Sequence, residues 1–354
     1  MLKRKIKVGV VAFGMSARVI HCPLIASNNN YELVAVVERH AEKSKAAYPQ
    51  VQVVRDLDTL LAIDAIDLVV ITTPNDTHVS YAQKVLTSGK HCIVEKPFTV
   101  TEQEARSLAL LASETGKVLS VFQNRRWDGD FLTVKKILAE DILGHVVEIE
   151  SRYERFRSSK KDNAWREQEE FPGSGILYDL GSHLFDQIVD LYGTPDYVTA
   201  TVRNERQLKS NSDDSFLVVL DYPSKNFKAI CRAGMLVRDP PPRFTVLGTC
   251  GSFKKYGLDI QEEQLKQELT PLDPAYGKDN SARFGTLDAE IRPGLHVRGA
   301  VTTVDGTYQA YYDNVAAAIY GEASLIVTAD QAADVIRIIE LAKQSSNERR
   351  SLPF

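Results

Sequence analysis

Short apolar runs alternate with helical segments through the first 122 residues, and this alternation constrains the fold more than any other feature. Each run ends in turn residues, as the first does at Gly14. Strands that are buried on both faces of a parallel sheet have this character. The expected strands are residues 6–13, 31–37, 51–54, 68–72, 91–94 and 118–122, and the expected helices are residues 16–27, 77–88 and 101–115, the last with a capping box of Thr101 and Glu104. We therefore predict a doubly wound parallel sheet, whose ligands bind beyond the carboxyl ends of the strands.

From Gln123 onward the pattern changes to alternating apolar and polar residues, which is typical of strands with one exposed face. Such segments lie at residues 143–156, 197–203, 215–221, 227–235 and 244–247. They predict a second, α+β domain with a large open and mainly antiparallel sheet, so the domains are residues 1–122 and 123–354. Residues 257–310 are expected to be loops, and residues 311–345 to be helical in two pieces, broken around 321–328.

The charge balance and the cysteines exclude several classes of protein. Lys and Arg number 43 and Asp and Glu 47, which gives a net charge of -4. We therefore expect no partner nucleic acid and no anionic membrane surface. No continuous apolar stretch is long enough to span a membrane, and no signal peptide is recognisable. Four cysteines without a C-x-x-C motif, and no metal-ligand spacing, predict a cytoplasmic protein with reduced thiols and no metal site.

A nucleotide site is predicted at the end of the first strand, where residues 12–17 read Ala-Phe-Gly-Met-Ser-Ala. The dinucleotide fingerprint G-x-G-x-x-G keeps only its central glycine here, so a plain strand–turn–helix is the alternative. The candidate phosphate-loop residues are Phe13, Gly14, Met15 and Ser16. Glu38 closes the second strand, where an acidic residue binds the ribose hydroxyls, and this favours NAD over NADP. Arg39 could instead hold the 2′-phosphate of NADP.

A second candidate site comes from Asp179 and His183, which are four residues apart between Gly175 and Gly193. On a helix the two side chains share a face. Oxidation of an alcohol needs a base for the hydroxyl proton while hydride leaves the carbon, and imidazole titrates near neutral pH. A carboxylate beside the ring can fix its tautomer. The alternative is an ordinary hydrogen bond on a helix surface.

Several motifs together resemble one known family. They are Thr73-Pro74-Asn75-Asp76-Thr77-His78, Glu95-Lys96-Pro97, residues 123–127 (Gln-Asn-Arg-Arg-Trp), residues 179–183 (Asp-Leu-Gly-Ser-His), residues 311–314 and residues 327–329. Along nearly its whole length the chain resembles the Gfo/Idh/MocA oxidoreductases. It is most similar to their scyllo-inositol dehydrogenase branch, because of residues 16–23 with His21 and because of residues 123–127. Ala12 departs from the glycine that is usual in the family.

The resemblance implies a Rossmann domain followed by a substrate-binding α/β domain whose open sheet makes a homodimer or homotetramer. It also implies NAD or NADP as cofactor and a polyol or sugar as substrate. Lys96 would lie near the nicotinamide, hydrogen-bond the reacting oxygen and offset its negative charge, with a bond to Pro97 that is often cis. A surface lysine is the alternative. Whether Lys96 or His183 takes the proton is left open by the sequence.

Further candidates follow the same resemblance. The cofactor region would include Thr73, Pro74, Asn75, His78 and Glu95, although a structural role suits the side chain of His78 better. The candidate substrate-binding residues are Asn124, Arg125, Trp127, Tyr153, Trp165 and Tyr312, and each could instead be a packing residue. Together these expectations describe an NAD(P)-dependent dehydrogenase that transfers hydride between nicotinamide and a secondary alcohol or ketone of an inositol-like polyol or sugar. A non-catalytic nucleotide sensor and an NAD-assisted glycosidase are the alternatives.

Overall fold

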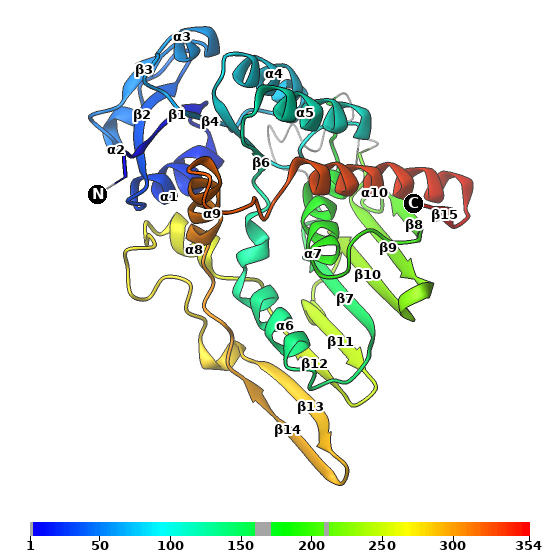
Figure 1. Ribbon diagram of the computed structural model, residues 1–354. Helices are drawn as coiled ribbons and strands as arrows, with labels where there is room; N and C mark the ends of the chain where they lie inside the picture. The colour runs from blue at the N-terminus through cyan, green and yellow to red at the C-terminus, as the bar shows by residue number, and fades with distance from the viewer. Residues whose placement is uncertain (1–2, 160–170, 209–211) are drawn as a thin grey trace. The chain divides into compact units, whose positions relative to one another are not determined.

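The computed structural model describes residues 3–159, 171–208 and 212–354, and the chain divides into two compact units (Figure 1). The first unit consists of residues 1–127, 260–277 and 307–333. The second unit consists of residues 128–259, 278–306 and 334–354. Each unit has its own sheet.

The first unit is built on a six-stranded parallel sheet, as the sequence predicts. Its strands are β1 (Ile6–Val11), β2 (Tyr31–Val37), β3 (Gln52–Val54), β4 (Leu68–Ile71), β5 (His91–Val94) and β6 (Leu119–Val121). Their order in the sheet is β3-β2-β1-β4-β5-β6, which is the order of a Rossmann fold. The strands are almost wholly apolar because helices cover both faces of the sheet, and all four residues of β4 are buried. The predicted Rossmann domain is confirmed.

Helices connect these strands; those near residues 16–27, 77–88 and 101–115 are expected from the sequence, whereas the short helices over residues 44–47 and 57–61 are not. The connecting helices are the π-helix η1 (Ala17–His21), α1 (Cys22–Ala26), α2 (Ser44–Ala47), α3 (Leu57–Leu61), the 3-10 helix η2 (Asn75–Thr77), α4 (His78–Thr87), α5 (Glu102–Thr115) and the 3-10 helix η3 (Asn124–Trp127). The capping box is confirmed: the Thr101 side chain accepts the Glu104 N–H at 3.3 Å, and the Glu104 carboxylate accepts the Thr101 N–H at 2.9 Å. Gly116 ends α5 with a φ of 62°, a left-handed conformation that suits glycine.

Two later segments also belong to the first unit, although the division of the sequence at residue 122 places them in the second domain. They carry α8 (Gln261–Lys266) and α9 (Gln309–Ile319). Aromatic packing explains why α9 belongs here. The Tyr311 ring meets Phe122 edge-on at 4.9 Å and Trp127 at 5.7 Å, and the Tyr31 hydroxyl donates to the carbonyl of Tyr312. These contacts join residues far apart in the chain, so no local pattern in the sequence indicates them.

The second unit holds a nine-stranded mixed sheet. Its strands are β7 (Val146–Glu154), β8 (Tyr197–Arg203), β9 (Ser215–Tyr222), β10 (Phe227–Gly234), β11 (Phe244–Gly248), β12 (Gly251–Lys255), β13 (Gly285–Arg292), β14 (Leu295–Val301) and β15 (Leu352–Pro353). The order is β14-β13-β12-β11-β7-β10-β9-β8-β15, antiparallel except where β7 pairs with β10. The predicted large, mainly antiparallel sheet is thereby confirmed.

Helices accompany this sheet in the second unit. They are α6 (Gly129–Ala139), the π-helix η5 (Leu177–Gly181), α7 (Ser182–Tyr192) and the 3-10 helices η6 (Pro223–Lys225) and η7 (Ser281–Arg283). Both η5 and α7 pack against β10. The last long helix, α10 (Ala329–Glu348), begins in the first unit and continues into the second. The break expected between the two C-terminal helices is present, since α9 ends at Ile319 and α10 begins at Ala329.

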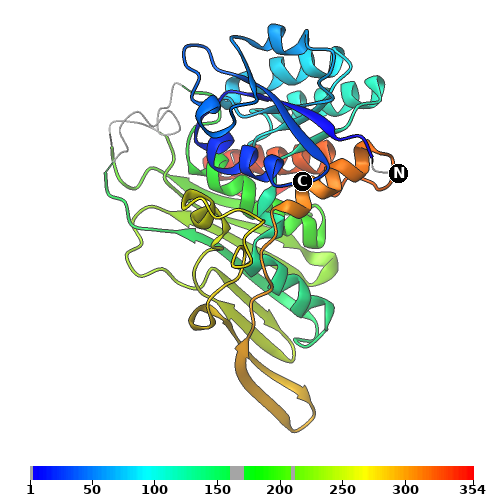
Figure 2. The same ribbon diagram turned by 90° about the vertical axis from the view of Figure 1, so that its left-hand side faces the viewer.

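The expectation of loops over residues 257–310 is wrong, because β13 and β14 form a hairpin there. Figures 1 and 2 show this hairpin extending away from the rest of its sheet. Six of the seven residues of β14 are exposed, so the strand has no buried face that would produce an alternating pattern. The turn lies at Pro293 and Gly294, and Gly294 has a φ of 76°. Exposure on both faces explains why periodicity fails to reveal the hairpin.

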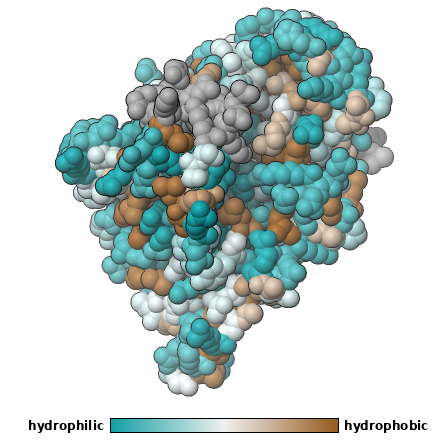
Figure 3. Space-filling view, turned by 180° about the vertical axis from the view of Figure 1, so that it is seen from behind, coloured by the Kyte–Doolittle hydropathy of each residue, from teal (hydrophilic) through white to brown (hydrophobic). Residues whose placement is uncertain are grey.

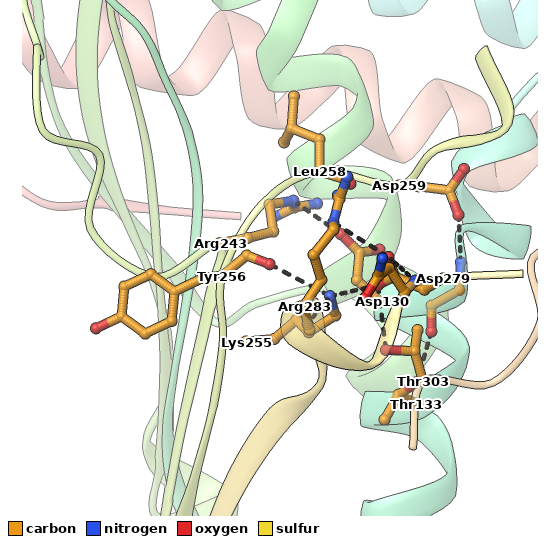
Figure 4. A network of polar contacts seen from close by, with 12 residues as sticks. Asp130, Thr133, Arg243, Lys255, Tyr256, Leu258, Asp259, Asp279, Arg283 and Thr303 are labelled. Atoms are coloured by element: carbon orange, nitrogen blue, oxygen red, sulfur yellow. Dashed lines mark hydrogen bonds and ion pairs between the residues drawn. The ribbon is translucent and has the colours of Figure 1, made fainter. Parts of the chain in front are cut away.

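A buried ion pair anchors the base of this hairpin (Figure 4). The ammonium of Lys255 donates to Asp279 at 2.8 Å and to the carbonyl of Arg283 at 2.6 Å. The Thr303 hydroxyl donates to the same carboxylate at 3.2 Å. Lys255 is almost fully buried, so the loss of Asp279 would leave its charge uncompensated, whereas Asp279 itself also pairs with Arg283 at 3.1 Å. The network ties β12 to the segments that enter and leave the hairpin.

The exposed apolar side chains are scattered over the described surface. Seen from behind, hydrophobic side chains lie among hydrophilic ones (Figure 3). The most exposed large apolar residues are Leu272, Leu110, Tyr256 and Met15. In the described parts of the chain no helix combines the length and the apolar character needed to cross a membrane.

Candidate active site

The turn after β1 has the backbone of a phosphate-binding loop. Ala12 has a φ of 75°, a left-handed conformation that favours glycine and explains why glycine is usual there. A Cβ on Gly14 would meet nothing within 4 Å, so this side of the loop is open. No side chain caps η1 and its first turn has no acidic residue, which leaves the positive end of the helix for an anion. This arrangement fits a dinucleotide pyrophosphate.

The side chains of the loop differ in their exposure. Met15 is exposed, Phe13 is half-buried, and the Ser16 hydroxyl donates to the carboxylate of Glu95. Ser16 therefore does not cap the helix that follows it. The hydroxyl links the phosphate loop to the motif at the end of β5, on the same edge of the sheet.

Glu38 is held by its own chain rather than left open for a ribose. One oxygen of its carboxylate accepts the Ser44 N–H at 2.8 Å and the Ser44 hydroxyl at 2.6 Å, and the other accepts the Lys43 N–H at 2.9 Å. The residue is buried. A carboxylate has about four acceptor positions, so only about one remains. Arg39, which follows it, is exposed.

The Glu95-Lys96-Pro97 motif follows β5 and includes a cis bond between Lys96 and Pro97. The Lys96 N–H donates to Oε2 of Glu95 at 3.0 Å. The other oxygen, Oε1, lies 3.0 Å from Nε2 of His21 and also accepts from Ser16. Burial alone would raise the pKa of Glu95. The pKa is instead lowered to about 2, because His21 contributes a hydrogen bond and positive charge, Ser16 contributes a hydrogen bond, and Lys96 contributes positive charge. The carboxylate is therefore a fixed negative charge beside Lys96.

His78 ties the turn after β4 to the Lys96 turn. Its Nε2 lies 3.0 Å from the carbonyl oxygen of Thr73, and its Nδ1 lies 2.9 Å from that of Pro97. Burial lowers the pKa of His78, opposed by these contacts with carbonyl oxygens. The neighbouring Pro74 is exposed and Asn75 is buried. The side chain of His78 thus makes structural contacts; binding of cofactor by residues 73–75 stays a prediction.

In the second unit, Asp179 and His183 lie on either side of the junction between η5 and α7. Asp179 is in the π-helical turn and half-buried, and His183 is in the first turn of α7 and buried. The His183 ring meets the Tyr153 ring edge-on, with centroids 6.5 Å apart and planes at 77°. The Tyr153 hydroxyl donates to Asp128 at 3.4 Å. Both π-helices, η1 and η5, thus adjoin candidate site residues, as single π turns often do at functional sites.

A buried arginine that the sequence analysis does not single out lies beneath Tyr153. The guanidinium carbon of Arg243 is 4.1 Å from the ring centroids of both Tyr153 and Phe244. The terminal guanidinium nitrogens donate to the Ser151 hydroxyl at 2.5 Å and to Oε1 of Gln187 at 2.7 Å. Nε of Arg243 lies 3.6 Å from the carboxylate of Asp130 (Figure 4). Because Gln187 is one turn after His183, Arg243 braces both the ring and the helix. Arg243 lies between three prolines and β11, a position that predicts a turn before a strand, so no sequence signal indicates this role.

Asp213 fixes the start of η5 and is a second residue that the sequence analysis does not identify. Its carboxylate accepts the Leu177 N–H at 2.7 Å, and its carbonyl accepts the Ile176 N–H at 3.1 Å. A Cβ on Gly175 would overlap this carboxylate, so the close approach requires glycine. Burial raises the pKa of Asp213 to about 6, against the lowering effects of the Leu177 hydrogen bond and the charge of Lys343.

The candidate substrate residues are found in different environments. Asn124 and Trp127 are buried in η3, and Arg125 pairs with Glu262 at 2.7 Å. Tyr312 is fully buried, and its hydroxyl lies 2.6 Å from Nδ1 of His21. Trp165 lies outside the described residues. Substrate binding by these residues and by Tyr153 stays a prediction.

The described residues contain no cluster of three or more His, Cys, Asp or Glu side chains arranged to hold a metal ion. All four cysteines are free thiols. Three of them are buried, and burial raises the pKa of Cys22 to about 12, so this thiol is unreactive at neutral pH.

Comparison with known sequences places these features in one family. The family profile described as an oxidoreductase NAD-binding Rossmann fold matches residues 6–123, and the one described as an oxidoreductase C-terminal alpha/beta domain matches residues 135–354. The chain belongs to the Gfo/Idh/MocA oxidoreductase family. Accordingly, it is an oxidoreductase with an NAD(P)-binding Rossmann domain.

Relatives within the Gfo/Idh/MocA family match the chain along nearly its whole length. The Escherichia coli oxidoreductase YdgJ is 42% identical over 98% of both chains. The Bacillus subtilis scyllo-inositol 2-dehydrogenase (NADP(+)) IolW is 38% identical, over 98% of this chain and 95% of IolW. Among solved structures, the oxidoreductase YvaA of Bacillus subtilis is similar with a TM-score of 0.92 and 36% identity, over 99% of this chain and 100% of that one. The predicted family is confirmed.

Proposed function

We propose that this oxidoreductase transfers hydride between NADP and a secondary alcohol or ketone of a cyclic polyol or sugar. The observation that carries the proposal is the Lys96 turn, which a charged carboxylate holds at the carboxyl end of β5 in a nucleotide-binding sheet. The relative IolW, which is named an NADP-dependent scyllo-inositol 2-dehydrogenase, supports the polyol class.

The roles of the residues follow from the bonds that change. Oxidation breaks the C–H and O–H bonds of the carbinol and forms C=O; the bound nicotinamide supplies the acceptor for the hydride. Lys96 hydrogen-bonds the reacting oxygen and stabilises its negative charge. His183 accepts the hydroxyl proton, and Asp179 orients its ring. Proton transfer first to Lys96 is the competing assignment, and His183→Ala distinguishes the two because it removes only one of the bases.

Preference for NADP over NAD follows from the contacts of Glu38. NAD-specific recognition uses the acidic residue after the second strand for the ribose hydroxyls, but this carboxylate already accepts three hydrogen bonds from Lys43 and Ser44. Arg39 is exposed beside it and can pair with a 2′-phosphate. The sequence alone favours NAD because of Glu38, whereas the contacts of Glu38 lead us to propose NADP.

Measured kinetics with the two cofactors test this preference. Arg39→Ala should lower kcat/KM for NADP by about tenfold or more, the equivalent of one charge-assisted hydrogen bond, and leave the value for NAD unchanged. Lys45→Ala, which removes another exposed cation from the same segment, is the matched control. Equal loss with both cofactors would contradict the proposal.

Absorbance at 340 nm tests the activity itself. Purified protein with NADP or NAD is offered scyllo-inositol, other inositols, aldoses and sugar acids at alkaline pH. Growth of the signal with a polyol establishes the dehydrogenase. A flat panel together with demonstrable nucleotide binding would favour the sensor, and release of an aryl leaving group from a glycoside would favour the glycosidase.

A second copy of the chain is the proposed partner of the open sheet face in the second unit. Leu217 and Val219 lie on that face of β9, and Ile230 of β10 is directly opposite Val219. Neighbouring charges are paired, since Arg152 and Arg232 both contact Glu154. An apolar strip with neutralised charges suits an isologous interface. Leu217→Glu should lower the mass measured by light scattering, and Leu110→Glu, an exposed residue of the first unit, should not.

A further inference from the structure

We propose that Tyr312, His21 and Ser16 form a buried hydrogen-bonded chain that holds the Glu95 carboxylate and thereby positions Lys96 for catalysis. The inference rests on the proposed role of Lys96 and adds three positioning residues to it. All of these residues belong to the first unit.

The chain of contacts runs from the core to the Lys96 turn. The Tyr312 hydroxyl is 2.6 Å from Nδ1 of His21, and Nε2 of His21 is 3.0 Å from Oε1 of Glu95. Ser16 donates to the same oxygen, and the Lys96 N–H donates to Oε2 at 3.0 Å. Glu95 is thus held through both of its oxygens, on one side by the core and on the other by the lysine's own backbone.

His21 is surrounded in a way that fixes its ring. Its side chain has no exposed surface, and the Phe122 ring packs on it with centroids 4.1 Å apart. Burial of an imidazole is costly unless both nitrogens find partners. Both nitrogens have partners here, so the pocket matches the two hydrogen-bonding positions of an imidazole as well as its size.

Glu95 and Tyr312 together satisfy one form of the His21 ring: the carboxylate, which only accepts, requires a hydrogen on Nε2, and the tyrosine hydroxyl pairs with Nδ1. When the hydroxyl donates to Nδ1, the ring hydrogen is on Nε2, facing the carboxylate. In the charged ring both nitrogens carry hydrogen, and Nε2 again donates to Glu95. The tautomer with hydrogen on Nδ1 alone would turn a lone pair toward the carboxylate and repel it. Loss of the tyrosine hydroxyl removes the hydrogen-bond partner of Nδ1 inside a buried pocket and so loosens the ring that holds Glu95.

The consequence for Lys96 is electrostatic as well as geometric. Three donors stabilise the ionised form of Glu95, so a negative charge stays next to Lys96. An ammonium is the form that stabilises a developing oxyanion. Because Ser16 belongs to the phosphate loop, the same carboxylate also links the lysine turn to the loop that would hold the cofactor.

Two adjacent tyrosines provide a matched test. Tyr311 and Tyr312 are both buried on α9 and each makes one side-chain hydroxyl hydrogen bond, but the Tyr311 hydroxyl donates to Ser120 at 3.0 Å, outside the chain that holds Glu95. Tyr312→Phe should lower kcat about tenfold, the effect of one hydrogen bond, with little change in substrate KM. Tyr311→Phe should lower the melting temperature similarly and leave kcat within about twofold of the wild type.

A second pair of variants separates positioning from stability. Glutamine can both donate and accept a hydrogen bond at position 21, and leucine can do neither. His21→Gln should therefore have a higher kcat than His21→Leu. Both variants should still bind NADP, as measured by fluorescence quenching. Equal kcat in Tyr312→Phe and Tyr311→Phe, or no advantage of His21→Gln, would overturn the inference. Full activity of Lys96→Ala would instead overturn the proposed function, so the two failures are distinguishable.

Discussion

Glu95 in the first unit and Asp213 in the second are carboxylates that hold candidate catalytic segments, yet their pKa values shift in opposite directions. The pKa of Glu95 falls to about 2 and that of Asp213 rises to about 6. Burial raises both, so the difference comes from their partners. Glu95 receives donors from Ser16, His21 and Lys96, whereas the carboxylate of Asp213 accepts the Leu177 N–H and is helped by the more distant charge of Lys343.

Hydrogen-bond donors, more than burial, therefore decide whether a shielded carboxylate stays charged. In the first unit, hydrogen bonds from Ser16, His21 and the Lys96 N–H keep the Glu95 carboxylate charged beside the lysine. The second unit instead holds His183 by packing: the imidazole contacts the Tyr153 ring, which lies against the guanidinium of Arg243. Perturbations of the two regions should therefore differ in kind, with electrostatic effects near Lys96 and packing effects near His183.

The largest expected effect on stability is near His183, where packing holds the candidate catalytic residue. Arg243→Met keeps much of the volume but leaves the buried carboxylate of Asp130 without its cation. Urea unfolding of the second unit should show a loss of about 3–5 kcal/mol. Arg232→Met, which removes a partly exposed arginine from Glu154, should cost less than about 1 kcal/mol. A loss at Arg243 no greater than that at Arg232 would show that the stack is not a structural support.

The pH dependence of stability gives the next effect and tests the opposite shifts directly. Asp213 binds its proton more tightly in the folded state, so its contribution to stability falls as pH rises from about 4 to 6. Asp213→Asn should remove this fall, which is on the order of 3 kcal/mol. Glu95 has the opposite sign: its contribution is present above pH 4.5 and is lost as pH falls toward 2. Thermal unfolding in both pH ranges measures the two slopes, and slopes of the same sign would refute the comparison.

The smallest effect concerns the phosphate loop that Ser16 joins to Glu95. Ala12 has a φ of 75°, where a side chain is strained. Ala12→Gly should stabilise the native loop by about 1 kcal/mol, partly offset by the greater freedom of glycine in the unfolded chain. Titration with NADP should show equal or tighter binding. Weaker binding, with the melting temperature unchanged, would mean that the alanine itself contacts the nucleotide.

The sequence predicts the first sheet well because strands buried on both faces leave continuous apolar runs, as in β1 and β4. It fails at the β13–β14 hairpin, where β14 is exposed on both faces and β13 buries only Gly285 and Ala289. Lys96, Asp179 and His183 are suggested by motif and spacing. The contact between His21 and Tyr312 joins positions 291 residues apart, and Glu38 turns to a serine six residues later. The hydrogen-bond partner of each of these side chains is set by the folded structure, and the spacing of residues in the sequence does not reveal it.

Hydride transfer in a single turnover tests the central claim most directly. The active polyol from the substrate panel is mixed with NADP and excess enzyme, and formation of NADPH is followed at 340 nm in the wild type, Lys96→Ala and His183→Ala. Both variants should bind NADP with unchanged affinity and transfer hydride about 10²–10⁴-fold more slowly. Transfer at the wild-type rate in both variants would contradict the account.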